Sequence, residues 1–441
     1  MSERLISCDL LVIGAGPAGL AAADCAAQSG LSVTIVDDNP APGGQIWRGE
    51  QRKPSSKEAQ TLFQRIQNSN VRILTSASVF HQPEAGTLLA ERSDGVYELR
   101  YGKLAVAAGA RERFLPFPGW TLPNVMGAGG LQALVKSGLS IEGKKVVVAG
   151  SGPLLLAVAA YLRRSGAEVL LIAEQAPLSR LLSFAVHLTK EPRKVIQAIK
   201  FRSALSKVKY LTGCWPVEAL GEEVLSGVTL RQGERSWRVS CDFLACGFHL
   251  VPNLELALLL GCEIDNGTVW VDDFQKTSLP NTYCAGEQTG IGGLELSVVE
   301  GQISGYAAAD NPEKARRLFS LREKQRRFAA VLNRTFKLRD ELKALPAMQT
   351  IVCRCEDVIF GVLREFDSWR AAKLQSRCGM GPCQGRVCGG ALEFLMDWRL
   401  ESVRPPIMPV KVGSLTSENG HAVAAEQYVF AQKATKQELQ R

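Results

Sequence analysis

An apolar strand pattern followed by three spaced glycines, close to the N-terminus, constrains this chain more than any other feature of its sequence. Residues 10–13 predict a buried parallel strand, and Gly14, Gly16 and Gly19 follow at G-x-G-x-x-G spacing before an Ala-rich helical pattern. A second β-rich run ends at Asp37, 23 residues beyond Gly14. This order of strand, glycines, helix, strand and acid is typical of a βαβ unit that binds a dinucleotide.

Each part of this unit has a physical role. The first glycine makes the tight turn, the second lets the backbone approach a pyrophosphate, and the third allows close packing of the helix on the strand. The helix N-terminus favours phosphate, and the acid after the second strand accepts hydrogen bonds from an adenosine ribose. The candidate cofactor contacts in this unit are Gly14, Gly16, Pro17, Ala18, Gly19, Asp37 and Asp38.

Two later stretches resemble the segments that close over FAD in flavoproteins with two dinucleotide-binding domains. In "YGKLAVAAGARERFLPFPGW", from residue 101, an alanine stands where that family usually has the threonine of an A-T-G segment. In "LPNTYCAGEQTGIGG", from residue 279, a glutamate replaces the usual aspartate and keeps its carboxylate. The resemblance implies FAD, with the further contacts Ala108, Gly109, Gly286 and Glu287.

A second copy of the βαβ pattern lies between these two stretches. Gly150 and Gly152 keep the spacing, but Leu155 stands at the third glycine position. The position 23 residues past Gly150 holds Ala173, and Glu174 comes one residue late. We therefore expect the fold of a nicotinamide domain without assured NAD(P) chemistry. A packing domain, or one that binds another adenine nucleotide, remains open.

Five cysteines gather near the end of the chain, among many glycines. Cys353 and Cys355 form a C-x-C pair, 27 residues separate them from Cys383 and Cys388 at C-x4-C spacing, and Cys378 stands outside this pattern. Four thiolates from two short loops suit a tetrahedral zinc or a [2Fe–2S] cluster. Glycine-rich backbone and a helix N-terminus at the last cysteine offer N–H groups to an anionic centre, which favours iron–sulfur. Zinc and incidental buried cysteines remain open.

The cysteine segment makes a family resemblance specific. "CRCEDV" followed by "GMGPCQGRVC" resembles the bacterioferritin-associated-ferredoxin type of [2Fe–2S] domain. Joined to an FAD unit, it resembles the flavoprotein subunits of opine oxidase, hydrogen cyanide synthase, D-hydroxyproline dehydrogenase and dye-linked proline dehydrogenase over residues 8–413. "DDNPAPGGQIWR" resembles a segment of the same group and adds Gly44 and Gln45 as cofactor contacts. The resemblance implies the cluster ligands Cys353, Cys355, Cys383 and Cys388.

Other expected features are absent or undistinguished. No redox-active C-x-x-C pair exists outside the cluster segment, and Cys241 and Cys246 are expected to be buried small apolar residues. No general base can be assigned. Residues 310–345 hold eleven Lys/Arg against five Asp/Glu in a helical pattern, which predicts a solvated linker helix, with a patch that docks an acidic partner as the alternative. Prolines in 404–413 predict an extended arm on a neighbouring surface.

We therefore predict an α/β chain with two Rossmann-like, thioredoxin reductase-like domains and a small C-terminal [2Fe–2S] domain. It lacks a secretory signal, an apolar run long enough to span a membrane and any nucleic-acid module, which predicts a cytoplasmic protein. The predicted parts are an FAD domain (1–115 and 245–310), an inserted second dinucleotide domain (116–244), a linker (311–348), the [2Fe–2S] domain (349–402) and an extended arm (403–441).

The predicted function is electron transfer in a heteromeric amino-acid or amine dehydrogenase or oxidase. On the resemblance, a partner flavoprotein oxidises an opine, hydroxyproline, proline or glycine-type substrate, and a small ferredoxin-like subunit is a further candidate partner. One alternative is a self-sufficient NAD(P)H-dependent reductase, which needs a nicotinamide in the second βαβ unit. The other is an iron–sulfur redox sensor, against which the complete FAD frame counts.

Overall fold

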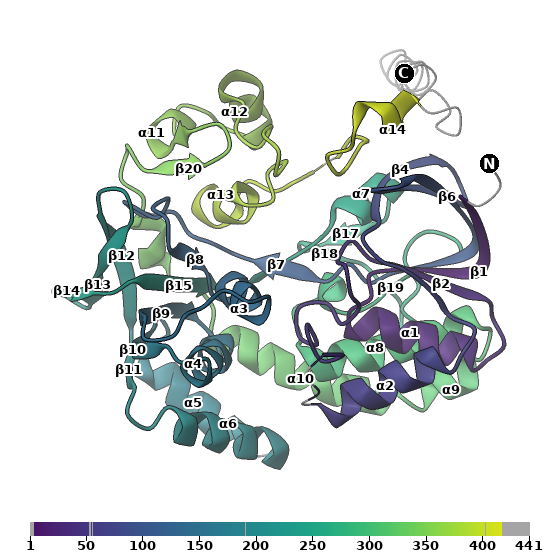
Figure 1. The fold of residues 1–441 in the computed structure, drawn as a ribbon, viewed down its shortest axis with the longest axis horizontal. Coiled ribbons are helices and arrows are strands. Elements are labelled where there is room, and N and C mark those ends of the chain that lie inside the picture. Colours follow the sequence, from purple (N-terminus) through teal and green to yellow (C-terminus); the bar gives the residue numbers. More distant parts are fainter. Residues whose placement is uncertain (1–3, 53, 55, 190, 402, 417–441) are drawn as a thin grey trace.

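The computed structural model describes residues 4–52, 54, 56–189, 191–401 and 403–416 (Figure 1). Two α/β bodies lie side by side, and a small cysteine-rich body sits above the second of them. The chain passes from the first body to the second through β7 (Ala110–Glu112) and returns through β16 (Leu250–Pro252), and these two strands pair antiparallel.

The first body is built on a seven-stranded sheet in the order β3-β2-β1-β6-β5-β4, with β19 also paired to β6. Strands β3, β2, β1, β6 and β19 run parallel, whereas β4, β5 and β6 form an antiparallel meander. Buried runs without alternation mark the central strands, as expected where helices cover a parallel sheet. The strands are β1 (Leu5–Ile13), β2 (Val33–Val36), β3 (Arg72–Leu74), β4 (Ser78–Glu84), β5 (Thr87–Arg92), β6 (Gly95–Val106) and β19 (Thr282–Cys284).

Helix α1 (Pro17–Ala27) and helix α8 (Leu294–Ala308) pack against one another beneath this sheet, beside α2 (Lys57–Gln67) (Figure 1). A Cβ at Gly301 or Gly305 of α8 would overlap a backbone carbonyl of α1, so the two helix backbones touch without side chains between them. This close contact brings together two segments that lie far apart in the sequence.

The second body has a five-stranded parallel sheet in the order β11-β10-β9-β15-β8. An antiparallel three-stranded sheet packs beside it, and the two bury a common apolar core. The strands are β8 (Val125–Gly127), β9 (Lys145–Ser151), β10 (Glu168–Glu174), β11 (Lys209–Thr212), β12 (Cys214–Gly221), β13 (Leu225–Gln232), β14 (Arg235–Ser240) and β15 (Phe243–Phe248). The helices are α3 (Ala128–Lys136), α4 (Leu154–Arg164), α5 (Leu178–Leu188) and α6 (Pro192–Ala204).

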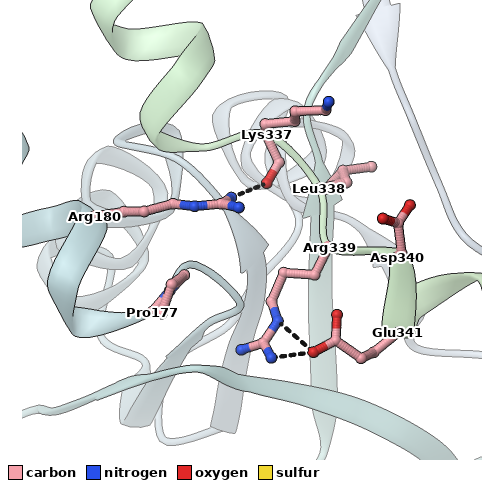
Figure 2. A pocket seen from close by; sticks show the side chains of 7 residues that line it. All are labelled: Pro177, Arg180, Lys337, Leu338, Arg339, Asp340 and Glu341. Carbon is pink, nitrogen blue, oxygen red and sulfur yellow. Dashed lines mark hydrogen bonds and ion pairs between the residues drawn. The ribbon is translucent and has the colours of Figure 1, made fainter.

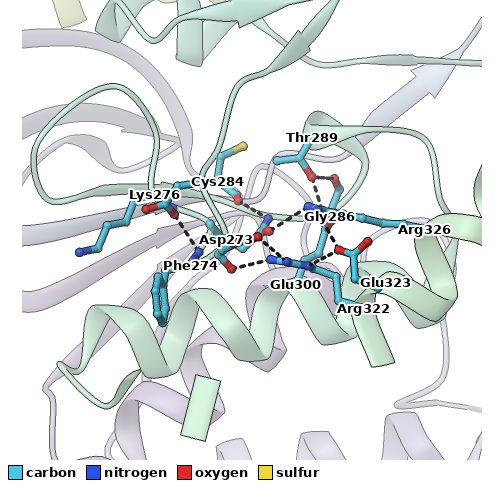
Figure 3. Close-up of polar contacts among 12 residues, drawn as sticks. Asp273, Phe274, Lys276, Cys284, Gly286, Thr289, Glu300, Arg322, Glu323 and Arg326 are labelled. Atoms are coloured by element: carbon cyan, nitrogen blue, oxygen red, sulfur yellow. Dashed lines mark hydrogen bonds and ion pairs between the residues drawn. The ribbon is translucent and has the colours of Figure 1, made fainter. Parts of the chain in front are cut away.

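The basic stretch after α8 forms α9 (Pro312–Arg316) and α10 (Phe319–Thr335), and α10 runs between the two bodies (Figure 1). The expectation of a solvated helix holds for its outward face but is wrong for Arg322, whose side chain is 2% exposed and pairs with Asp273 at 2.8 Å. Arg326 pairs with the buried Glu300 of α8 at 3.2 Å, and Figure 3 shows both arginines reaching from α10 toward the first body. A count of charges cannot tell which side of a helix meets acid partners.

The cysteine-rich body holds β20 (Ile351–Cys353), β21 (Val358–Ile359), α11 (Phe360–Leu363), α12 (Trp369–Ser376) and α13 (Cys388–Met396). It docks on the rest of the chain through polar contacts. Arg113 pairs with Glu393 of α13 at 2.6 Å, and the indole N–H of Trp120 donates to the carbonyl of Ile351 at 2.6 Å.

The segment after α13 returns to the first body, as expected for an extended arm on a neighbouring surface. Ile407 donates its N–H to the carbonyl of Phe80 in β4 at 2.9 Å, and Met408, Val410 and Leu415 pack against the apolar cluster around Phe80. The short helix α14 (Val412–Thr416) ends the described part of the arm, and residues 417–441 lie outside the described residues. The remaining elements are the short strands β17 (Ile264–Asp265) and β18 (Thr268–Val269) and the helix α7 (Glu255–Leu260).

Candidate functional site

The first glycine motif needs glycine for steric reasons. Gly14 has φ +104°, and a Cβ there would overlap the carbonyl oxygen of Ala107 at the end of β6. A Cβ at Gly19 would overlap the carbonyl oxygen of Gly14. Any side chain at either position would therefore push α1 away from the β1 turn, and the helix N-terminus would no longer face the carboxyl edge of the sheet.

The acid predicted to hold a ribose lies at the same edge. Asp37 follows β2, is 6% exposed, and accepts hydrogen bonds from the N–H of Ala15 at 2.5 Å and of Asn39 at 2.8 Å. These two bonds orient the carboxylate beside the glycine turn. Asp38 is exposed on the outer side of the same turn.

The segment after β2 folds back over the glycine motif. A Cβ at Gly44 would stand 3.0 Å from the Cα of Gly16, so the two backbones are in direct contact. Gln45 beside it is exposed. Trp47, in contrast, is 2% exposed and packs edge-on against Phe63 at 6.2 Å, so its role is structural.

The segment after β6 is held by hydrogen bonds to both the N–H and the carbonyl of Ala108. Ala108 donates its N–H to the side-chain oxygen of Gln288 at 2.8 Å and accepts from the side-chain amide of Asn253 at 2.8 Å. The N–H of Asn253 donates to the carbonyl of Gly109 at 3.0 Å. Sequence reasoning missed Asn253 and Gln288. Gln288 adjoins a predicted contact, whereas no local pattern marks Asn253.

The late motif meets the first helix turn. Gly286 has φ +85°, and a Cβ there would stand 3.0 Å from the Cβ of Ala18 in α1. Glu287 opens the short 3₁₀ turn η1 (Glu287–Thr289), and its carboxylate accepts from the N–H groups of Gly292 at 2.9 Å and Gly293 at 3.0 Å. Burial raises the pKa of Glu287. This carboxylate is therefore committed to the N-terminal turn of α8.

Three segments distant in sequence thus converge on one edge of the first sheet, at the ends of β1, β2, β6 and β19. The edge combines glycine-lined backbone, an open helix N-terminus without a side-chain cap, and a buried carboxylate held beside the turn. These features fit the pyrophosphate and ribose of a dinucleotide.

The cysteine-rich loops bring three of the five late cysteines into one group, which includes Cys378 but not the predicted ligands Cys355 and Cys383. The sulfur atoms of Cys353, Cys378 and Cys388 lie within 4.8 Å of one another and are buried. Cys355 is exposed and lies in hydrogen-bond contact with Cys383. Cys378, which stands outside the spacing pattern, therefore lies beside two of the predicted ligands, Cys353 and Cys388.

Trp369, at the start of α12, explains why this segment is rich in glycine. A Cβ at Gly379, Gly385 or Gly389 would stand 3.2 Å, 2.9 Å or 2.7 Å from its indole ring. The loop therefore wraps the ring with bare backbone on three sides. The glycines were expected because they free N–H groups, and the structure adds a packing reason that no spacing rule reveals.

Of the three buried cysteines, Cys353 lies in an environment that favours its thiolate, whereas the pKa values of Cys378 and Cys388 are raised. Gly379 donates its N–H to the sulfur of Cys353 at 3.4 Å. Hydrogen bonds from the Cys378 and Cys388 side chains lower the pKa of Cys353 to about 2. Cys388 is the first residue of α13, where the helix dipole favours negative charge. Thiolates, inward N–H donors and two short loops fit a [2Fe–2S] cluster.

A continuous set of polar contacts joins the cysteine loop to the edge of the first sheet. Arg386 donates to the carbonyl of Cys383 at 3.4 Å and lies 3.8 Å from the carboxylate of Glu255. Glu255 pairs with Arg111 at 2.7 Å, and Arg111 donates to the side chain of Asn253 at 2.8 Å. Asn253 is the residue that holds the segment after β6.

The second glycine motif corrects one sequence argument. Counting residues from Gly150 put Ala173 at the ribose position, with Glu174 one residue late. In the structure a register shift between Val169 and Leu171 inserts one residue into β10, so that Glu174 pairs with Gly150. The second unit therefore does carry an acid at the end of its second strand, in the register that Asp37 has in the first.

The carboxylate of Glu174 is fully buried and accepts from the N–H groups of Gly152 and Ala176, each at 2.8 Å. Burial raises its pKa to about 7. Leu155, at the third glycine position, is also fully buried and fills the space between α4 and the sheet. The second unit thus keeps the acid but replaces the close helix contact with a packed side chain.

The linker after α10 is fastened to this second motif. Ser151 donates its hydroxyl to the carbonyl of Phe336 at 2.8 Å, and the amide of Gln175 donates to Ser151 at 2.9 Å. The N–H of Arg339 donates back to Gln175 at 3.2 Å. Gln175 is fully buried, so these bonds replace water that it would otherwise need.

A cavity of about 290 Å³ opens beside this junction, beyond the end of β10. Figure 2 shows Arg180 bonded to the carbonyl of Lys337 across it, and Arg339 turned toward Glu341. The cavity is lined by both cationic and acidic side chains, and the fully buried Glu174 is not among them.

No disulfide is formed in the part of the chain that the structure describes, where all twelve cysteines are free. Cys241 and Cys246 are 3% and 0% exposed, which confirms that they are buried core residues. Within the described ranges, no helix has the length and apolar character needed to cross a bilayer.

Residues 8–309 match the family model for pyridine nucleotide-disulphide oxidoreductases. The chain belongs to this family of FAD-binding oxidoreductases and, within it, to the group that contains the A subunit of opine oxidase. It is 30% identical to that opine oxidase protein of Rhizobium meliloti (strain 1021), over 92% of this chain and 98% of the relative. It is 28% identical to hydrogen cyanide synthase subunit HcnB of Pseudomonas aeruginosa, over 86% of this chain and 90% of that protein.

The fold also agrees with a solved structure, L-proline dehydrogenase from P. horikoshii. The TM-score is 0.65 at 19% identity, and the match covers 94% of this chain and 80% of that chain. These findings confirm the predicted family and the predicted thioredoxin reductase-like α/β fold. They also make a heteromeric arrangement the expected one, because the opine oxidase and hydrogen cyanide synthase relatives are subunits.

Proposed function

We propose that this chain is the FAD- and [2Fe–2S]-carrying electron-transfer subunit of a heteromeric amino-acid or amine dehydrogenase. The observation that carries the proposal is the polar bridge from Cys383 through Arg386, Glu255 and Arg111 to Asn253. It fastens the cysteine loop to the segment that the family uses for flavin. Two redox groups held on one frame are suited to passing electrons from one to the other.

In this proposal FAD lies along the carboxyl edge of the first sheet. The N-terminus of α1 would hold its pyrophosphate, Asp37 would accept hydrogen bonds from its ribose, and the segments at Gly44, Ala108 and Gly286 would supply further backbone contacts. FAD accepts electrons in pairs and passes them on singly, which a one-electron cluster requires. Glu287 stays a proposed cofactor contact, because a carboxylate that accepts two backbone N–H groups keeps further lone pairs, as Asp37 does.

The cluster is assigned to Cys353, Cys355, Cys383 and Cys388. Changing Cys383 or Cys388 to Ser is expected to remove the iron–sulfur absorption of the purified protein and to spare most of the flavin, since the two groups lie in separate bodies. Retention of full iron content in both variants would contradict the ligand assignment. Zinc content measured alongside separates the iron–sulfur cluster from a structural zinc site.

Substrate oxidation is assigned to a partner flavoprotein, because no general base can be named beside the flavin segments in the described residues. The names of the relatives favour a substrate with a primary or secondary amine. Twelve free cysteines suit a reducing compartment, so we assign the complex to the cytoplasm and include a small ferredoxin-like protein among its components.

The test is an anaerobic assay with a dye acceptor against glycine, proline, hydroxyproline and opines, first with the isolated chain and then with the partner flavoprotein added. We expect turnover only in the mixture, and loss of dye reduction in the mixture when Cys383 is changed to Ser. Equal turnover by the isolated chain would contradict the relay role.

A second candidate function is a self-sufficient NAD(P)H-dependent reductase, because Glu174 stands in register at the end of β10. The carboxylate is fully buried, however, and does not line the cavity nearby. Leu155 also stands at the position where nicotinamide-binding units have a glycine that lets the helix pack closely on the strand. Slow or absent reduction of the flavin by NADH and NADPH is expected. Rapid anaerobic bleaching by either would favour a self-sufficient reductase.

A further inference from the structure

Cys378 is a fifth thiol at a centre that needs only four ligands. Its side chain is fully buried, and its sulfur lies within 4.8 Å of the sulfurs of Cys353 and Cys388. The four cysteines assigned as ligands leave it without a role. A buried, polarisable S–H group next to a thiolate is nevertheless a hydrogen-bond donor.

The backbone around Cys378 fixes where its side chain points. Arg377 ends α12 in the left-handed region at φ 64°, and Gly379 follows at φ +81°. The carbonyl of Cys378 accepts from the indole of Trp369 at 3.4 Å, and its N–H donates to the hydroxyl of Ser376 at 3.4 Å. Both peptide groups of Cys378 are therefore held in place, and its side chain is fully buried.

Two consecutive residues therefore stand beside one sulfur atom. Gly379 donates its N–H to the sulfur of Cys353 at 3.4 Å, and the thiol of Cys378 lies next to the same sulfur. Hydrogen bonds to cluster sulfurs are one of the factors that set the reduction potential of iron–sulfur centres. A donor withdraws charge from the ligand sulfur, so it stabilises the reduced, more negative form of the cluster.

We propose that Cys378 is a positioning residue that donates its S–H to the sulfur of Cys353 and thereby raises the reduction potential of the cluster without ligating it. The inference rests on the proposed [2Fe–2S] cluster. On this inference the reduction potential of the cluster depends on the turn at residues 377–379 as well as on the four ligands.

The test is a redox titration of the purified full-length protein, followed by electron paramagnetic resonance of the reduced cluster. Cys378→Val removes the donor and replaces the thiol with two methyl groups, so the midpoint potential is expected to fall while iron and sulfide content stay unchanged. Cys378→Ser keeps a donor and is expected to restore a potential close to that of the parent protein. Cys378→Ala serves as a second donor-free variant if valine disturbs folding.

Cys241→Ala, a buried cysteine of the second body, is the matched control and should leave the potential unchanged. An unaltered potential in both donor-free variants would overturn the inference and leave Cys378 a packing residue. Loss of iron from both donor-free variants would also overturn it, by making Cys378 a ligand. A parent protein without any iron–sulfur signal, even after anaerobic reconstitution, would instead refute the proposed function on which the inference rests.

Discussion

The chain contains two βαβ units with the same glycine spacing, and they differ in how the helix meets the sheet. In the first unit Gly19 lies against the carbonyl of Gly14, so the N-terminus of α1 stands directly at the sheet edge. In the second unit Leu155 fills that space, and α4 begins behind a packed side chain. The residue at this one position, Gly19 or Leu155, thus distinguishes a unit whose helix N-terminus can approach a pyrophosphate from one that keeps only the βαβ fold.

The acids of the two units are alike in register but not in surroundings. Asp37 and Glu174 each follow the second strand and each accept two backbone N–H groups. The residue after Asp37 is exposed, whereas the residue after Glu174, Gln175, is fully buried and holds the linker. The second unit has therefore become a docking surface for the chain's own connection to the cysteine-rich body.

The largest effect is expected from making the first unit resemble the second. Gly19→Leu places a side chain where even a Cβ overlaps the carbonyl oxygen of Gly14, and overpacking of this kind costs about 1–3 kcal/mol or more. The purified variant should contain little or no flavin by absorbance. The reciprocal change, Leu155→Gly, is the control and should leave the flavin content unaltered. A flavin-replete Gly19→Leu protein would show that the close helix contact is not required.

A large effect of pH is expected from the second acid. Burial raises the pKa of Glu174 to about 7 from its ordinary 4.5, so between these pH values the folded state binds more protons than the unfolded state. Stability should therefore be highest below the unfolded pKa and should fall as the pH rises through 7, by up to about 3 kcal/mol. The measurement is the free energy of unfolding against pH for the parent and Glu174→Gln.

In Glu174→Gln this loss of stability with rising pH should be absent, whatever the variant's absolute stability. Parallel pH profiles for the parent and Glu174→Gln would mean that the buried carboxylate is charged throughout this range.

A somewhat smaller effect is expected when the first acid is removed. Asp37→Ala takes away a hydrogen-bonded carboxylate at the ribose position and should weaken FAD retention by roughly 1.5–3 kcal/mol. The check is the flavin content of dilute protein after dialysis. Glu174→Ala, which removes the counterpart acid, should retain its flavin. Equal flavin loss in the two variants would mean that the loss comes from general destabilisation.

Local sequence patterns were sufficient for the first unit, because its glycines, its helix and its acid follow one another within a single short stretch of chain. They failed at Glu174, because a single extra residue inside β10 moved the acid into register, and no residue count reveals such a bulge. They gave no sign that Cys378 lies beside Cys353 and Cys388, because ligand spacing ignores residues that a turn folds back into the group.

Long-range packing set the remaining limits on prediction. Asn253 meets Ala108 across 145 positions, and Arg322 finds Asp273 across 49. The indole ring of Trp369 leaves no room for a side chain at three glycine positions of the cysteine loop, although no spacing rule links these positions. The family resemblance supplied the relation between the flavin and cysteine segments, but not the polar bridge through Arg386 and Glu255 that joins them.

The smallest expected effect tests whether the second unit now serves as a dock for the linker. Gln175→Ala removes a buried amide bonded to Ser151 and Arg339, so it leaves those partners unsatisfied and should lower the free energy of unfolding by about 1–3 kcal/mol. Asp38→Ala, at the equivalent position of the first unit, is exposed and should change stability by less than about 0.5 kcal/mol. Chemical denaturation of both variants gives the comparison directly. If the two variants lost equal stability, the contact between Gln175 and the linker would carry no energetic weight. A loss confined to Gln175→Ala would mean that the second βαβ unit contributes to holding the linker, and through it the cysteine-rich body, in place.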